Sequence, residues 1–280
     1  MSGSRANDVC RGGFSWRSAG GDNAGTAPVV LLHGLMGSRF SWEPQLVGLG
    51  VLHHVVAWDL PGYGNSERLA SPVTFAALGD AVARFADVIG AERVHLVGLS
   101  FGGMIAQYVA AWHADRVATL TLMATSPKFG LDGTSPEEWR SARLVPLDAG
   151  IEPIEFAPRV LAAIAGPQIT SEALGGQVRA AANVSGAALR TSIDVLIEHD
   201  SRDILGLVTA PTQCLVGELD TETPVEYASA IAQRIPRARL HVVAGAGHLL
   251  NVEAPEVVNE LLDNFFREGM SGRPRIGARR

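Results

Sequence analysis

Short apolar runs alternate with segments of helical periodicity along most of this chain. The run at 28–32 (Pro-Val-Val-Leu-Leu) has no polar face, which is typical of a strand buried on both sides in a helix-covered parallel sheet. Further strands are predicted at 14–18, 54–58, 94–97, 117–123, 212–216 and 240–243. Helices are predicted near 42–49 and at 75–89, 103–113, 225–234 and 254–267. This alternation predicts an α/β fold with a mostly parallel central sheet flanked by helices.

The strand pattern stops between residues 126 and 207, where helical signals take over. Ser135 can cap a helix that has Pro136 at its first position and Glu138 three residues after the cap, a combination that favours helix initiation. Further helices are predicted at 153–165, 171–183 and 187–198. We therefore divide the chain into a core at 8–125 and 208–268 and an inserted helical cap at 126–207, with disorder expected at 1–7 and 269–280.

The composition narrows the class of protein. A chain of 280 residues with 47% hydrophobic content can bury the core of one domain with an insertion. The formal net charge of −6 gives no electrostatic footprint for nucleic acid. Cys10 and Cys214 are too few for a disulfide scaffold, and neither zinc-ligand spacing nor a run of about 18 apolar residues occurs. We expect a cytoplasmic protein without a metal, a cofactor, or nucleic-acid or membrane partners.

One pentapeptide between a predicted strand and a predicted helix carries a specific chemical signal. Residues 98–102 (Gly-Leu-Ser-Phe-Gly) fit G-x-S-x-G, the nucleophile elbow. A serine on so tight a turn needs neighbours almost without side chains, which explains Gly98 and Gly102 by crowding and Gly103 by close helix packing. The turn lifts Ser100 Oγ out of the sheet and leaves the Phe101 N–H facing the same space.

An elbow serine becomes reactive when a histidine takes its proton and an acid holds that histidine. The expected chain order is serine, acid, histidine, each after a sheet strand. Asp220 follows the strand at 212–216, and His248 follows the strand at 240–243. Glu218 and Glu222 remain open as alternative acids. The other histidines precede this position or lie within other predicted elements.

Two further residues are candidates by their place in loops. Asp59 also follows a strand but precedes the serine, so we interpret it as a turn former before Leu60-Pro61-Gly62. An oxyanion formed at the substrate needs two N–H donors. The Phe101 N–H is one, and the Leu35 N–H, in the loop opened by His33-Gly34, is the second candidate. His33 itself is expected to order this loop rather than to take protons.

Taken together, these motifs resemble the α/β-hydrolase fold family. The matching segments are 33–38, 59–66, 98–102, the Asp220 loop and 247–248. The resemblance implies the α/β-hydrolase fold, with Ser100 as nucleophile, Asp220 as orienting acid and His248 as general base. It also implies that the Leu35 and Phe101 amides form the oxyanion hole. Relatives that open epoxides or remove halide usually carry aspartate at the elbow, so Ser100 argues against both chemistries.

Within that family, residues 98–107 and 136–143 resemble 3-oxoadipate enol-lactonases. Those enzymes act on a small carboxylated lactone, and Arg140 or Arg143 on the first cap helix could meet such a carboxylate, with Trp139 beside them. The later cap helices depart from that pattern because they are rich in Ala, Leu, Ile and Val. This difference leaves room for a more apolar ester or lactone.

The sequence as a whole predicts a cofactor-independent serine hydrolase. Its expected partner is a small-molecule ester or lactone, and the chain is expected to be a monomer or a homodimer. Two alternatives stay open. One is a carbon–carbon bond hydrolase of the meta-cleavage product type, and the other is a hydrolase-like binding protein that holds a ligand without turnover.

Overall fold

The fold is built on one eight-stranded sheet. The structure, a computed structural model, describes residues 6–21 and 26–271. The strands follow the order β1-β2-β4-β3-β5-β6-β7-β8, with β1 and β2 antiparallel to their neighbours and the rest parallel. Their bounds are β1 Asn7–Arg11, β2 Phe14–Ala19, β3 Val29–Leu32, β4 Val55–Trp58, β5 Val94–Leu99, β6 Val117–Met123, β7 Thr212–Gly217 and β8 Arg239–Val243.

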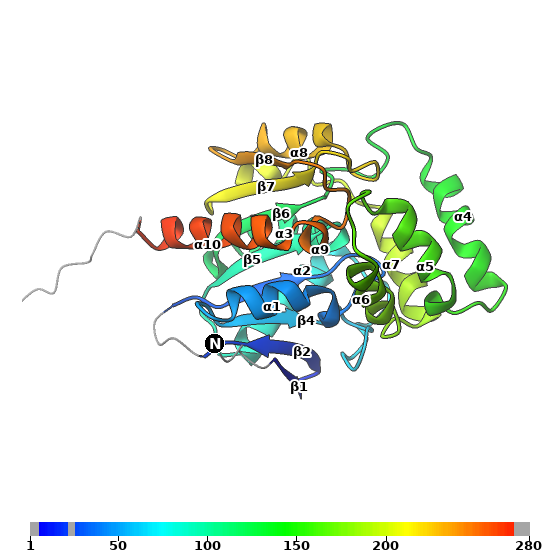
Figure 1. Ribbon diagram of the computed structural model, residues 1–280, viewed down its shortest axis with the longest axis horizontal. Helices are drawn as coiled ribbons and strands as arrows, with labels where there is room; N and C mark the ends of the chain where they lie inside the picture. The colour runs from blue at the N-terminus through cyan, green and yellow to red at the C-terminus, as the bar shows by residue number, and fades with distance from the viewer. Residues whose placement is uncertain (1–5, 22–25, 272–280) are drawn as a thin grey trace, which may run out of the picture.

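Helices cover both faces of this sheet (Figure 1). One face carries α1 (Glu43–Leu49) and α10 (Pro255–Ser271), and the other carries α2 (Phe75–Val88), α3 (Phe101–Trp112) and α8 (Val225–Ala232). The expected mostly parallel α/β sheet is confirmed. Within the described residues, no helix combines the length and the apolar character needed to cross a membrane.

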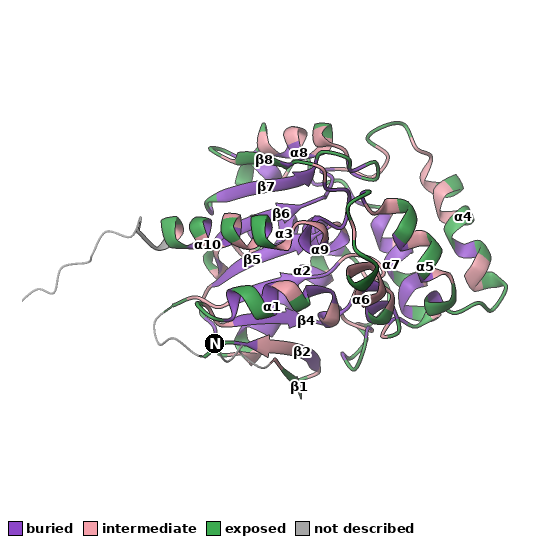
Figure 2. Ribbon diagram, viewed as in Figure 1, coloured by how far each residue is buried: buried purple, intermediate pink, exposed green. Residues whose placement is uncertain are grey.

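Burial follows the prediction made from the apolar runs. All residues of β3, β4, β5 and β7 are buried, and Figure 2 shows the centre of the sheet as buried throughout. The edge strands β1 and β8 are mostly exposed. A strand needs an apolar side chain at every position only where helices cover both of its faces, as they do at the centre of this sheet.

Four helices lie between β6 and β7 in the chain, beyond the ends of the strands (Figure 1). They are α4 (Pro136–Asp148), α5 (Pro153–Ile164), α6 (Ser171–Ala181) and α7 (Gly186–Leu196), and we call them the cap helices. Helix α5 packs against α6, and α4 packs against α7. Ser135 caps α4 as expected, since its side chain accepts a hydrogen bond from the Glu138 N–H. The division into core and cap segments stays a prediction.

The chain ends and four short helices differ from the sequence-based expectation. The structure places Asn7 in β1 and residues 269–271 in α10, where we expected disorder. Strand β1 escaped detection because it lies at the exposed edge of the sheet and shows no apolar alternation. The short helices η1 (Arg39–Trp42), η2 (Ala114–Arg116), η3 (Leu205–Leu207) and α9 (Leu250–Glu253) also went undetected. The remaining parts of the expected disordered ends, 1–5 and 272–280, lie outside the described residues.

Crowding at the elbow is visible in the backbone. A Cβ atom added to Gly98 would lie 2.4 Å from Gly102 O, and one added to Gly102 would lie 2.2 Å from Leu32 O. Gly103 lies against the side chain of Thr125, 2.7 Å from where its own Cβ would be. These approaches are closer than any side chain allows, so the turn from β5 into α3 depends on glycine.

This crowding predicts a loss of stability on adding one methyl group. Gly102→Ala should destabilise the fold by roughly 1–3 kcal/mol or more, because the Leu32 backbone cannot move aside freely. Gly206→Ala is a matched control, since nothing lies within 4 Å of its added Cβ, and it should change stability by less than about 0.5 kcal/mol. Denaturant midpoints followed by circular dichroism measure both. Equal midpoints for the two variants would contradict the explanation.

Candidate active site

Ser100 sits at the junction between β5 and α3. Its backbone has φ 54° and ψ −118°, a left-handed conformation that is rare for a residue other than glycine. The Ser100 N–H donates to Met123 O at 2.9 Å, and Thr125 Oγ1 donates to Ser100 O at 2.8 Å. Hydrogen bonds from the Ser100 N–H and to its C=O thus hold this strained backbone conformation. The Ser100 side chain faces a cavity.

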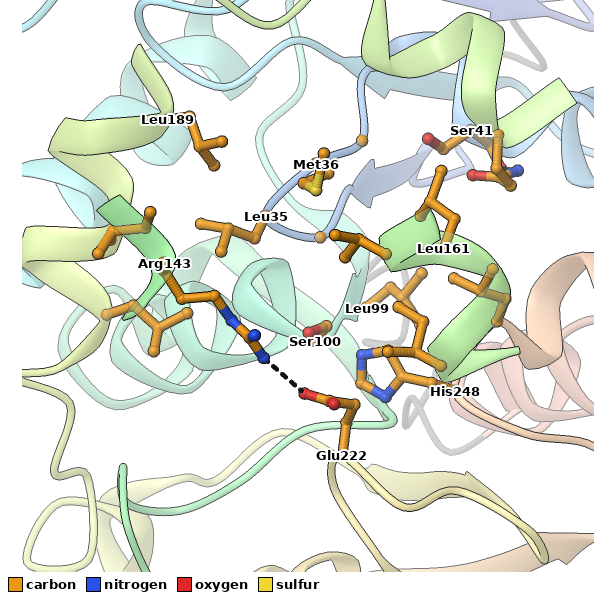
Figure 3. Close-up of a pocket in the computed structure, with 18 of the residues that line it drawn as sticks. Leu35, Met36, Ser41, Leu99, Ser100, Arg143, Leu161, Leu189, Glu222 and His248 are labelled. Atoms are coloured by element: carbon orange, nitrogen blue, oxygen red, sulfur yellow. Dashed lines mark hydrogen bonds and ion pairs between the residues drawn. The ribbon is translucent and has the colours of Figure 1, made fainter. Parts of the chain in front are cut away.

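That cavity, which we call the apolar cavity, has a volume of about 150 Å³ and lies between the core and the cap helices (Figure 3). Ser100 and His248 both line it. Most of its wall is apolar and comes from the loop after β3, from β5 and from the cap helices: Leu35, Met36, Leu99, Trp139, Phe156, Val160, Leu161, Ile164, Leu189, Ile193 and Leu196. The site therefore offers an apolar surface on one side of the serine.

A second cavity of about 300 Å³ adjoins the same serine and histidine. We call it the polar cavity, because much of its wall consists of polar side chains: Lys128, Asp132, Thr134, Thr221, Thr223 and Tyr227. Ser100, Arg143, Glu222 and His248 line both cavities. A group bound at Ser100 can thus extend into two surroundings of different polarity.

Asp220 and His248 form a buried hydrogen-bonded pair. His248 Nδ1 lies 3.1 Å from Asp220 Oδ1 and 3.0 Å from Oδ2. The carboxylate also accepts the N–H groups of Glu222 and Thr223 and the Thr223 hydroxyl, each at 2.9 Å. Because the carboxylate can only accept, Nδ1 carries the hydrogen and Nε2 is left to act as a base.

The three acidic candidates have separate partners. Asp220 is the one bonded to His248, whereas Glu218 accepts the Gly245 N–H at 2.9 Å. Glu222 pairs with Arg143 at 4.0 Å. This arrangement favours Asp220 over the two glutamates as the residue that orients the histidine.

Burial and charge act in opposite directions on this pair. Burial alone would raise the pKa of Asp220, but the charge of His248 and the hydrogen bonds to His248 and Thr223 lower it overall. Burial alone would lower the pKa of His248, but Asp220, and then Glu222 and Glu253, raise it above its ordinary value. The imidazolium is thus stabilised, as a base that takes a proton during reaction requires.

Figure 3 shows the His248 ring beside Ser100, with both side chains facing the apolar cavity. In the part of the chain that the structure describes, no hydrogen bond joins Ser100 Oγ to His248. Hydrogen bonds between such groups are often long or poorly aligned before substrate binds. Among the described residues, no cluster of three or more His, Cys, Asp or Glu side chains is arranged to hold a metal ion.

The two expected oxyanion donors belong to segments that adjoin Ser100. Phe101 is the first residue of α3, so its N–H has no acceptor within the helix. The loop with Leu35 passes close by, because a Cβ added to Gly34 would lie 3.3 Å from Ser100 Cβ. Tyr63, fully buried, donates its hydroxyl to Leu35 O at 2.8 Å.

Buried His33 fixes the orientation of this loop. Its Nε2 accepts the Leu60 N–H at 3.0 Å, so Nδ1 carries the hydrogen and donates it to Gly34 O at 2.8 Å. Burial lowers the pKa of His33, which keeps the ring neutral in this role. Since the C=O and N–H of a trans peptide point in opposite directions, holding Gly34 O turns the Leu35 N–H away from His33.

The three substrate-binding candidates on α4 have different surroundings. Trp139 and Arg143 line both cavities, and the Arg143 guanidinium lies over the Trp139 ring at 5.0 Å. Arg140 instead pairs with Asp194 of α7, with Nε 2.6 Å from Oδ1. Figure 3 shows the Arg143–Glu222 pair crossing the cavity near Ser100. Arg143 is thus the arginine of the two that lines the site.

The structural role of Asp59 goes beyond forming a turn. It is fully buried, and its carboxylate accepts the Arg39 N–H at 2.8 Å and the Ser15 hydroxyl at 2.7 Å. The Arg39 guanidinium also pairs with it. A buried charge needs such partners, so this carboxylate joins β2, β4 and η1.

Sequence reasoning missed much of the cavity wall. Phe156, Val160 and Ile164 of α5 recur at intervals of four residues, which places them on one face of a helix. That periodicity was available in the sequence, but it does not reveal which partner the face meets. The pairing of Glu222 with Arg143 joins residues distant in the chain and had no local signal.

Comparison with known proteins identifies the family. Residues 29–261 match the Alpha/beta hydrolase family. The chain is 32% identical over 231 residues to the pimeloyl-(acyl-carrier protein) methyl ester esterase of Chromobacterium violaceum, covering 79% of this chain and 86% of that protein. It is 23% identical over 246 residues to 3-oxoadipate enol-lactonase 1 of Acinetobacter baylyi, covering 86% and 89%.

A solved structure agrees with this match. The crystal structure of the enol-lactonase from Burkholderia xenovorans LB400 resembles this fold with a TM-score of 0.79 and 23% identity, covering 93% of this chain and 100% of that one. The chain therefore belongs to the alpha/beta hydrolase family, and the predicted fold class is confirmed. It is a hydrolytic enzyme.

The role of His33 in the loop leads to a kinetic prediction. His33→Ala frees the Gly34–Leu35 peptide to turn, so kcat for an aryl ester should fall by about 10²–10³-fold, the loss typical of one missing oxyanion donor. His113→Ala, at the end of α3, serves as the control and should leave kcat unchanged. Steady-state kinetics on both folded proteins test this. Equal kcat for the two variants would rule out the orienting role.

The Asp220–His248 pair leads to a pH prediction. The base must be unprotonated, so kcat/KM should fall as the pH drops through the raised pKa of His248, with the acid limb above the ordinary histidine value of about 6.5. Asp220→Asn should move that limb to lower pH and reduce kcat by about 10⁴-fold. The measurement is kcat/KM against pH. Should Asp220→Asn stay within about tenfold of wild type, the acid role would pass to Glu218 or Glu222.

Proposed function

We propose that this protein is a serine hydrolase that cleaves a carboxylic ester or a lactone through Ser100, His248 and Asp220. The observation that carries the proposal is the buried Asp220–His248 hydrogen bond beside a serine in a left-handed elbow. The relatives named above as an esterase and an enol-lactonase support the same reaction class.

The proposed reaction follows from the positions of these groups. His248 Nε2 takes the proton of Ser100 Oγ, and the oxygen adds to the substrate carbonyl. The N–H groups of Leu35 and Phe101 stabilise the negative oxygen. His248 then gives its proton to the departing alcohol oxygen, and water, activated by the same ring, releases the acid from Ser100.

The lining of the apolar cavity supports an uncharged, apolar substrate portion. Its charged side chains are Arg143 and Glu222, and these already neutralise each other. We propose that an apolar acyl or ring portion lies in this cavity, where the cap helices exclude water. A small carboxylated lactone is the second candidate, favoured by the position of Arg143, but its carboxylate must displace Glu222 from that arginine. The cytoplasmic location and the oligomeric state stay predictions.

A substrate panel tests the proposed function, with Ser100→Ala as the blank. We expect kcat/KM to be highest for a short apolar aryl ester or an apolar lactone, and Ser100→Ala to lower kcat by a factor on the order of 10⁶. A carboxylated enol-lactone and a dienone cleavage product complete the panel. Preference for the dienone would establish the carbon–carbon hydrolase instead. Labelling of Ser100 without product release would indicate a binding protein.

Arg143 decides between the two substrate candidates. If the substrate carries a carboxylate, Arg143→Met should raise its KM by at least about tenfold while leaving the apolar ester unaffected, because a charged hydrogen bond is lost. Arg140→Met is the matched control on the same helix. We expect Arg143→Met and Arg140→Met to behave alike on the apolar ester. A tenfold loss on that ester with Arg143→Met alone contradicts the apolar assignment.

A further inference from the structure

The carboxylate of Glu253 accepts hydrogen bonds from three backbone amides. Glu253 is half-buried at the end of α9, five residues after His248. Its Oε2 accepts the Gly247 N–H at 2.6 Å and the Gly166 N–H at 3.0 Å, and its Oε1 accepts the Leu249 N–H at 2.9 Å. Hydrogen bonds from N–H groups to an ionised acceptor are stronger than neutral ones.

These amides surround His248 in the chain and in space. Gly247 and Leu249 are its two neighbours, so one carboxylate fixes the backbone on both sides of the histidine. The third amide, at Gly166, follows the end of cap helix α5. The His248 N–H itself donates to Ile164 O at 3.1 Å. The segment 244–249, which we call the histidine loop, is therefore joined to the end of α5 directly through the His248 N–H and indirectly through Glu253.

The same loop is packed backbone against backbone. A Cβ added to Gly247 would lie 2.3 Å from Gly166 N, and one added to Gly217 would lie 2.2 Å from Gly247 O. The loop thus lies between the end of β7 and the end of α5 with no space for a side chain on these contacts. A shift of either neighbour must move the backbone that carries His248.

Charge adds to this effect. The groups that act on the His248 ring are Asp220 and Glu222 from the loop after β7 and Glu253 from α9. Glu222 is itself paired with Arg143 of α4. All three carboxylates raise the pKa of His248, against the lowering effect of burial. Removing the charge of Glu253 alone therefore shifts the pKa of the ring downward.

We propose that Glu253 is a positioning residue that holds His248 in its working place and makes that place depend on the docking of α5. This inference rests on the proposed function, in which His248 is the base. In this proposal α5 has a second role besides lining the apolar cavity. The end of the helix packs against the histidine loop and helps to fix the position of its backbone. Glu253 does not touch the reacting atoms and acts through the backbone of its neighbours.

Two substitutions of Glu253 separate geometry from charge. Glu253→Gln keeps the size but can no longer accept at both ends, so kcat/KM should fall about tenfold to a hundredfold and the acid limb of the pH profile should move to lower pH. Glu253→Asp keeps the charge but is too short to reach all three amides, so the rate should fall while the acid limb stays near that of wild type. Glu256→Gln, exposed at the start of α10, is the matched control and should change neither.

The contact between Glu253 and the end of α5 can also be tested by a substitution at Gly166. A Cβ added to Gly166 would lie 2.4 Å from Glu253 Oε2, so Gly166→Ala should reduce kcat/KM as Glu253→Gln does. Because both changes disturb the same contact of Glu253 with Gly166 and Gly247, the double variant should be scarcely slower than the slower single variant. Gly176→Ala in α6, whose added Cβ would approach only the end of the Arg179 side chain at 3.8 Å, is the control. Losses that multiply in the double variant would overturn the cap connection.

Active-site titration with a phosphonate keeps the test independent of folding. Each kcat is divided by the concentration of Ser100 that the reagent labels, and thermal unfolding is followed for every variant. The inference is overturned if Glu253→Gln has wild-type kcat per labelled site and an unmoved acid limb while Ser100→Ala is inactive. Failure of the proposed function looks different, because Ser100→Ala would then turn over substrate as fast as wild type.

Discussion

Close contact between backbones at the ends of the central strands is the constraint on which this structure depends. At Gly98 and Gly102 the elbow touches itself and β3, and at Gly217 and Gly247 the end of β7 touches the histidine loop. The serine and the histidine come from separate strands, and each is placed by peptide groups that leave no space for a Cβ. Side chains can rotate, whereas peptide groups packed against each other cannot. Such contacts therefore restrict the backbone positions of the serine and the histidine.

Two aspartates that each follow a buried strand show how the surroundings decide the use of a carboxylate. Asp59 lies against the guanidinium of Arg39, a permanent cation. The ion pair and hydrogen bonds of this aspartate join β2, β4 and η1. Asp220 meets the titratable ring of His248 together with neutral donors. Next to Asp220 the pKa of His248 is raised, so a proton taken up by that ring is stabilised. The difference is in the partner and not in the aspartate.

The parts of the site that depend on local chain geometry could be predicted from the sequence. The elbow, the glycines around it and the order of Ser100, Asp220 and His248 follow from strand–turn–helix patterns. The structure places Ser100 and His248 at one cavity and bonds Asp220 to His248 behind it. The pairing of Arg140 with Asp194 and of Arg143 with Glu222 could not be predicted, because each pair depends on how cap helices dock. Strand β1 was missed for a related reason, since an exposed edge strand needs no apolar pattern.

Two helices of the cap are held by different kinds of contact. At the end of α5, Ile164 O accepts the His248 N–H and the Gly166 N–H donates to the Glu253 carboxylate. Helix α4 packs against α7 and forms ion pairs between half-exposed side chains, which contribute little to stability. We therefore expect a change in the exposed ion pairs of α4 to disturb the backbone around His248 less than a change at the end of α5. In such an arrangement the α4 wall can change the shape of the site while the backbone around His248 keeps its place, whereas the end of α5 cannot change without moving that backbone.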